Sequence, residues 1–103
     1  MGMIENLERM LADGQDNAPL RYGLGNEYFK EGDVAMAAEH LARAVQLDKG
    51  YSAAWKLYGK VLVELGRASQ AVAVYEKGIE AAEAKGDKQA VKEMQVFLKR
   101  LRK

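Results

Sequence analysis

Glycines recur in this chain at an interval of 34 residues. Gly59 follows Gly25 by that interval, and Gly66 follows Gly32 by the same interval. Other small and apolar positions repeat with them, because Ala71, Tyr75 and Ile79 stand 34 residues after Ala37, Leu41 and Val45. A fixed interval of this size is typical of solenoids, in which each unit buries its apolar face only against its neighbours. The sequence therefore predicts a stack of similar units.

Residues 52–66 indicate that each unit begins with a helix. Trp55, Tyr58, Gly59 and Leu62 recur there at three- and four-residue spacing, so they share one helical face. Ser52 is a suitable N-cap, and Gly66 suits the left-handed residue that ends a helix. A second apolar stripe follows over 68–84, at Ala71, Val72, Tyr75, Ile79 and Ala82. Each unit is therefore predicted to be a pair of helices joined by a short turn.

Gly25 and Gly59 lie in the middle of their predicted helices. Glycine costs about 1 kcal/mol there relative to alanine. That cost is tolerated where a second helix must approach closely, so we expect both glycines at helix–helix contacts. A large side chain at Gly59 is then expected to be severely destabilising.

The repeated residues carry a family resemblance. Trp55, Gly59, Gly66, Ala71 and Tyr75 stand at the spacing of the tetratricopeptide repeat, and one unit earlier Leu24, Gly25, Tyr28, Gly32, Ala37 and Ala44 do so. The chain resembles the tetratricopeptide repeat (TPR) family over two full units, 18–51 and 52–85. One departure is Arg21, which stands where the family usually has tryptophan. The resemblance implies an all-α fold, a right-handed α-α superhelix of stacked helix pairs.

Each end of the chain adds one predicted helix to the two units. Residues 1–17 read as an N-terminal capping helix and linker, since Met3, Leu7, Met10 and Leu11 share a face over 3–12. Residues 86–103 read as a C-terminal capping helix, with its stripe at Ala90, Met94, Phe97, Leu98 and Leu101. We thus expect six helices in a single domain over 1–103.

Composition bounds the location and the kind of partner. Sixteen Lys and Arg stand against fifteen Asp and Glu, which gives no overall attraction to nucleic acid or membrane. There is no cysteine, and no apolar run of about 20 residues that would span a bilayer. The first residues lack the basic and apolar regions of a signal peptide. We expect a soluble cytoplasmic protein without membrane partners.

No residue constellation predicts catalysis. His40 is the single histidine, beside Leu41 at an expected helix edge, and a zinc site needs three or four ligands. Ser52 and Ser69 both read as helix-start residues without a neighbouring base. We therefore predict that the protein is not an enzyme and has no cofactor and no metal site.

The TPR resemblance implies a concave groove lined by the first helices of successive units. The groove positions of the family correspond here to Tyr22, Asn26, Phe29 and Lys30, then Lys56, Lys60, Val63 and Glu64. These aromatic, amide and cationic groups suit an extended or helical peptide that carries an acid. The alternative is that the lysines are ordinary solvated side chains and that Phe29 belongs partly to the core.

The two ends of the chain carry opposite charge. Residues 85–103 hold seven cationic side chains, Arg100 among them, against two acidic ones, whereas residues 1–17 hold four acidic side chains against one cationic one. The basic end can complement a helix C-terminus, form a nucleic-acid patch, or associate head to tail with the acidic end.

The leading hypothesis is a non-catalytic protein–protein interaction module that binds an unknown protein or peptide segment in its groove. The alternatives are a self-associating homo-oligomeric scaffold and, less favoured, a nucleic-acid accessory protein.

Overall fold

The computed structural model describes residues 2–103 and contains six α-helices in that range. They are α1 (Met3–Ala12), α2 (Ala18–Lys30), α3 (Val34–Leu47), α4 (Ser52–Glu64), α5 (Ala68–Lys85) and α6 (Lys88–Leu101). None of the described residues forms a strand. The predicted all-α class and the number of helices are confirmed.

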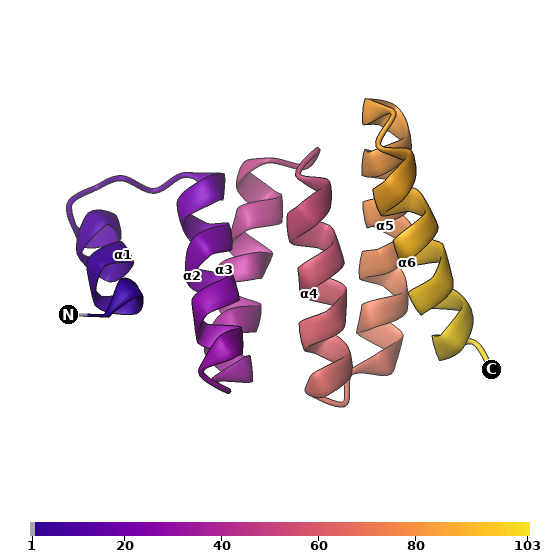
Figure 1. Cartoon of the computed structure of the whole chain (residues 1–103), viewed down its shortest axis with the longest axis horizontal. Helices are drawn as coiled ribbons and strands as arrows, with labels where there is room; N and C mark the ends of the chain where they lie inside the picture. The colour runs from indigo at the N-terminus through magenta and orange to yellow at the C-terminus, as the bar shows by residue number, and fades with distance from the viewer. Residues whose placement is uncertain (1) are drawn as a thin grey trace.

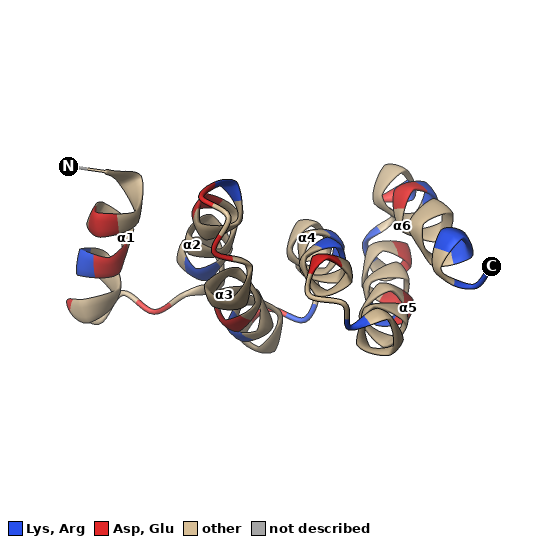
Figure 2. Ribbon diagram, turned by 90° about the horizontal axis from the view of Figure 1, so that it is seen from below, with Lys and Arg blue, Asp and Glu red and all other residues tan. Residues whose placement is uncertain are grey.

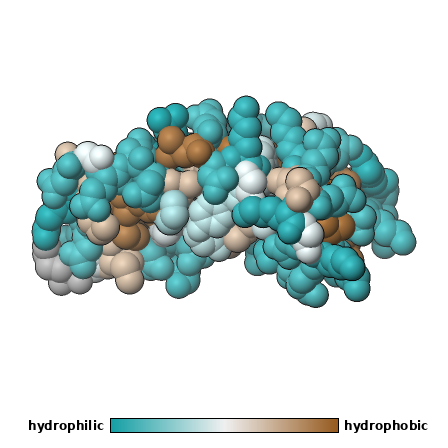
Figure 3. Space-filling view, turned by 90° about the horizontal axis from the view of Figure 1, so that it is seen from above, coloured by the Kyte–Doolittle hydropathy of each residue, from teal (hydrophilic) through white to brown (hydrophobic). Residues whose placement is uncertain are grey.

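The helices stack into two layers along the long axis of the molecule. Helices α2, α4 and α6 lie side by side in one layer, with α3 and α5 behind them (Figures 1 and 2). Helix α1 packs against α2 at one end, and the two termini lie at opposite ends of the 41 Å axis (Figure 1). The outline is arched (Figure 3), and the layer of α2, α4 and α6 lines the inner side of the arch. We call the exposed surface of these three helices the inner face.

Side-chain caps and left-handed glycines set the helix boundaries. Asn17, Asp33 and Asp87 each accept a hydrogen bond from a backbone N–H in the first turn of the helix they precede, at 2.9–3.2 Å. Gly66 has φ +75° between α4 and α5, a conformation that favours glycine.

Ser52 does not cap α4, contrary to the sequence prediction. It is the first residue of the helix and is buried, and its hydroxyl donates to Asp87 Oδ2 at 3.0 Å. Because Asp87 caps α6, this bond joins the start of α4 to the start of α6. The turn before α4 is held differently, by Trp55, whose indole Nε1 donates to the carbonyl of Lys49 at 2.8 Å.

Helix pairs meet at glycines whose missing side chains leave room for buried neighbours. A Cβ on Gly25 would lie 2.5 Å from Leu41 Cγ, and a Cβ on Gly59 would lie 2.4 Å from Tyr75 Cε1. Leu41 and Tyr75 are almost wholly buried, so neither can move aside without disturbing the core. The predicted close contacts at both glycines are present.

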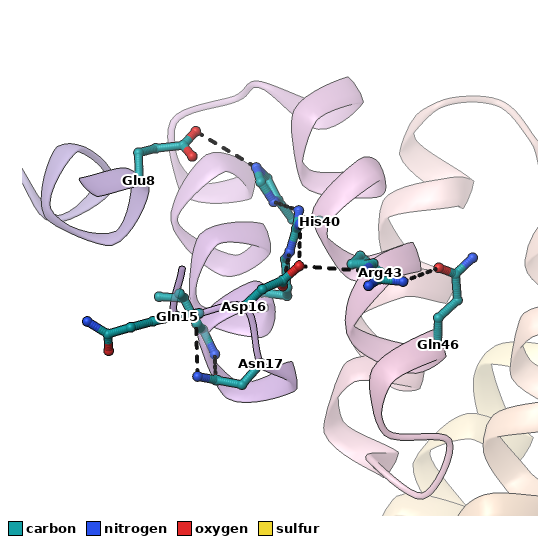
Figure 4. A network of polar contacts seen from close by, with 9 residues as sticks. Glu8, Gln15, Asp16, Asn17, His40, Arg43 and Gln46 are labelled. Atoms are coloured by element: carbon teal, nitrogen blue, oxygen red, sulfur yellow. Dashed lines mark hydrogen bonds and ion pairs between the residues drawn. The ribbon is translucent and has the colours of Figure 1, made fainter. Parts of the chain in front are cut away.

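A polar cluster holds the N-terminal end together. Arg21 donates two hydrogen bonds to Asp16, at 2.8 and 3.1 Å, and a third to His40 Nδ1 at 3.2 Å. Glu8 on α1 accepts a hydrogen bond from the Tyr28 hydroxyl at 2.5 Å. The Glu8 carboxylate also lies 3.9 Å from His40 Nε2 (Figure 4). Arg21 thus replaces the packing of the usual tryptophan with charge-assisted bonds to the linker. His40 is buried, at 5% exposure, and not at the expected helix edge.

The contacts of His40 determine the tautomer of its neutral ring. Arginine only donates hydrogen bonds, so Nδ1 must accept and the proton of the neutral ring must lie on Nε2. Nε2 is buried without a hydrogen-bond partner among the described residues. Burial lowers the pKa of His40, and the nearby Arg21 adds to this while Glu8 opposes it.

We expect Gly59→Ala to lower the free energy of unfolding by about 1–3 kcal/mol, because the added methyl overlaps the buried Tyr75 ring. Gly59→Leu is expected to cost more. The matched control is Gly23→Ala in α2, where the added Cβ would lie 3.6 Å from Leu7 Cδ1, an ordinary contact. This control is expected to gain about 0.5–1 kcal/mol from helix propensity. Chemical denaturation of both variants checks the pair, and a shift of the same sign in both contradicts the packing argument.

We expect the free energy of unfolding to fall as the pH drops below about 6.5, the ordinary pKa of histidine. The folded pKa of His40 is lowered, so the unfolded chain binds the proton more readily in this window and stability rises with pH. His40 is the only histidine, and carboxylates titrate at lower pH. Thermal melts at pH 7.5 and 5.5 test this, with His40→Gln as the variant that should lose the pH dependence. If His40→Gln lost as much stability between pH 7.5 and 5.5 as the wild type, groups other than His40 would cause the pH dependence.

Candidate functional site

All eight groove residues that the sequence predicted lie on α2 and α4, the first two helices of the inner face. Four of them are exposed, namely Lys30, Lys60, Val63 and Glu64, and four are half-buried, namely Tyr22, Asn26, Phe29 and Lys56. The surface that they form is mixed in character, with an apolar side chain, Val63, that is 42% exposed.

Both lysines of α4 have partners within the chain. The ammonium of Lys56 donates to Glu93 Oε1 on α6 at 3.0 Å, and that of Lys60 lies 5.9 Å from the centre of the Phe29 ring on α2. Partly exposed ion pairs are worth about 0–1 kcal/mol, and cation–π contacts at exposed sites about 0.5–1 kcal/mol. A ligand with a carboxylate can therefore displace either contact at small cost.

The aromatic groove residues contribute to the core as well as to the surface. Phe29 packs against the buried cluster of Ala37, Ala38, Leu41 and Val61. The Tyr22 ring lies 5.2 Å from that of Tyr51. The interpretation of Phe29 as partly a core residue is confirmed, which makes its exposed edge a rigid element of the surface.

A hollow of about 360 Å³ opens between α4 and α6 on the inner face. Its walls come from three helices, with Lys60, Val63 and Glu64 from α4, Tyr75 from α5, and Phe97, Arg100 and Leu101 from α6. The Phe97 and Tyr75 rings lie 5.7 Å apart and form an apolar floor. Burial raises the pKa of Tyr75 to about 12, so its hydroxyl stays neutral at physiological pH. Two cations and one carboxylate surround this floor.

The sequence pattern does not predict the part that α6 takes in this hollow. From the pattern alone, Arg100 belongs to the basic end, and Phe97 and Leu101 belong to the stripe of a capping helix. Helix α6 starts 36 residues after α4, not 34, because α5 is longer than α3. With that offset Arg100 corresponds to Glu64 of the groove set, so the third helix continues the inner face, whereas Phe97 and Leu101 correspond to Val61 and Leu65.

The described residues hold no group of three or more side chains that suits a metal ion. None of the helices over residues 2–103 is both long and apolar enough to cross a membrane. What the inner face offers is apolar surface, a rigid aromatic floor and displaceable charges, which are the groups of a binding site.

Comparison with known proteins identifies the family. A family model described as tetratricopeptide repeat matches residues 28–93. A TPR repeat-containing protein of Pseudomonas aeruginosa is 54% identical over 99 residues, which cover 96% of this chain and 94% of that protein.

Solved structures show the same fold. The solution structure of a Bordetella parapertussis protein superposes with a TM-score of 0.83 at 44% identity, over 98% of this chain and 88% of that one. A tetratricopeptide repeat domain protein of Salinibacter ruber superposes with a TM-score of 0.78 at 26% identity, over 84% of this chain and 87% of that one. With the repeat interval, the paired helices and these similarities in agreement, the chain belongs to the tetratricopeptide repeat family, whose fold supports protein interaction in general.

Proposed function

We propose that this protein binds a segment of another protein on its inner face and that it acts without catalysis. The observation that carries the proposal is the hollow between α4 and α6, where an apolar floor lies beside Lys60 and Arg100. Binding sites of this kind combine aromatic anchors with a few cationic groups, and such residues dominate the energy of many interfaces. The cytoplasmic location stays a prediction.

The chemistry of the hollow defines the ligand more closely. Val63, Phe97 and Leu101 suit an apolar side chain, while Lys60 and Arg100 suit a carboxylate next to it. Glu64 at the same rim disfavours a run of acidic residues by like-charge repulsion. We therefore infer a peptide with an apolar residue adjacent to a single Asp or Glu, in preference to a polyacidic segment.

Charge reversal tests this assignment. We expect Lys60→Glu combined with Arg100→Glu to weaken binding by at least about tenfold, since charge-assisted hydrogen bonds contribute about 1.5–3 kcal/mol. The matched control is Lys49→Glu combined with Lys77→Glu, two exposed residues away from the inner face. Peptides selected by phage display on the wild-type chain supply the ligand, and calorimetry with the three proteins measures its affinity. Equal affinity for all three would remove the inner face from the binding site.

An apolar position gives an independent test. Val63 is exposed at the mouth of the hollow, so Val63→Asp should leave the thermal melt unchanged. The same change should weaken the selected peptides, because it places a carboxylate where the apolar side chain docks. Circular dichroism and the binding assay on one sample separate the two effects. Unchanged affinity with an unchanged melt would show that peptides dock elsewhere.

A further inference from the structure

Helix α1 exposes part of an apolar stripe whose counterparts are buried in α3. Met3, Leu7 and Met10 stand 34 residues before Ala37, Leu41 and Ala44, all three of which are 0% exposed. In α3 this stripe includes Leu41, the side chain that lies against Gly25 of α2, the first helix of the same unit. In α1 the same positions include Met3 at 58% exposure and Met10 at 38%. Leu7 between them is half-buried, with its Cδ1 near Gly23 of α2. Helix α1 is therefore a second helix whose stripe α2 covers only in part, leaving Met3 and Met10 exposed.

Helix α6 is a first helix that has no second helix of its own among the described residues. With the 36-residue offset from α4, Ala90 and Leu98 are buried as are Ala54 and Leu62, so the faces of the two helices correspond. The α4 residues that lie against its second helix are Trp55, near Gly78, and Gly59, against Tyr75. Their counterparts on α6 are Val91, which is half-buried, and Gln95, which is exposed. Both line a hollow of about 370 Å³ at the corner between α5 and α6.

Each end of the molecule thus presents half of a repeat, and the two halves are of complementary kind. The stripe on α1 has the pattern of a second helix, and the face of α6 around Val91 and Gln95 has the pattern of a first helix. Their charges are complementary too, since residues 1–17 are net acidic and residues 85–103 are net basic. Lys88 and Lys99 are exposed on α6, and Glu5 on α1 and Asp13 directly after it are exposed at the other end.

We propose that a second copy of this chain covers these faces, with α1 of one molecule packed on α6 of the next. The pair completes one repeat between the two copies and continues the stack. Because α1 and α6 lie at opposite ends of the long axis (Figure 1), the contact is head to tail and forms open arrays.

The residue at the centre of the contact determines its strength. Leu7 approaches α6 at Gln95, whereas its counterpart Leu41 approaches a glycine. The Gln95 side chain keeps α1 and α6 further apart than a glycine would, so the contact between two copies is weaker than the contact between α2 and α3 within one repeat. Salt weakens it further by screening the opposite charges.

Two variants, each altered at one end only, test the proposal by sedimentation velocity on the full chain. Met3→Lys with Met10→Lys blocks the α1 end, and Lys88→Glu with Lys99→Glu blocks the α6 end. All four positions are exposed, so we expect both variants to fold. Circular dichroism checks that they do. The wild type should form larger species as its concentration rises and lose them in high salt. Each variant alone should stay monomeric, and an equimolar mixture should form a one-to-one dimer that grows no further.

Gln95→Ala provides a gain-of-association check, because it removes the side chain that separates the helices. It should shift the wild-type association to lower concentration. A wild type that is monomeric at every concentration overturns the proposal. So does a dimer formed by either blocked variant alone, since that outcome requires α1 to pair with α1 or α6 with α6. None of these changes touches the hollow of the inner face, so the outcome is independent of peptide binding.

Discussion

The contact between the Gly59 backbone and the Tyr75 ring fixes the geometry on which the rest of the molecule depends. A ring carbon 2.4 Å from the place of a Cβ leaves no room for any side chain, so α4 and α5 approach as closely as a backbone and an aromatic ring allow. Gly25 and Leu41 repeat the arrangement one unit earlier. Helix α3 in turn packs on α4, so α2 and α4 come to lie side by side in one layer (Figure 1). The Tyr75 ring also packs against the Phe97 ring of α6, and the two rings form the floor of the inner-face hollow.

The parts of the structure that were predictable from the sequence are those that repeat. The interval between Gly25 and Gly59 appears twice in the chain, so it predicted the helix pairs, their order and their contacts. The cluster of Glu8, Arg21 and His40 occurs once and joins residues up to 32 positions apart, so no spacing reveals it. The clue was present only as the departure at Arg21, where a charged residue replaces a packing one.

The misassignment of α6 has a single physical origin. A strict 34-residue interval is set by helices of equal length, but α5 has 18 residues and α3 has 14. The extra length delays the start of α6, so its inner-face residues fall out of the register that identified those of α4. The Ser52 hydroxyl was misassigned for a related reason: its partner, Asp87, lies beyond the repeat that contains it. Where the helices of a repeat differ in length, a fixed interval no longer aligns equivalent residues, whereas the caps still mark where each helix begins.

The position of the one tryptophan has a consequence for spectroscopy. Trp55 is buried in the second unit, and its indole is bonded to the turn before α4, more than 40 residues from α1 in sequence. Helix α1 packs on α2 and has no fully buried side chain, so it is the segment most easily detached by local unfolding. Intrinsic fluorescence therefore reports the centre of the stack and is blind to that detachment, whereas the far-ultraviolet signal registers the loss of one helix in six. A pair of melting curves that fail to coincide would in this chain mark the fraying of one end and not an intermediate of the core.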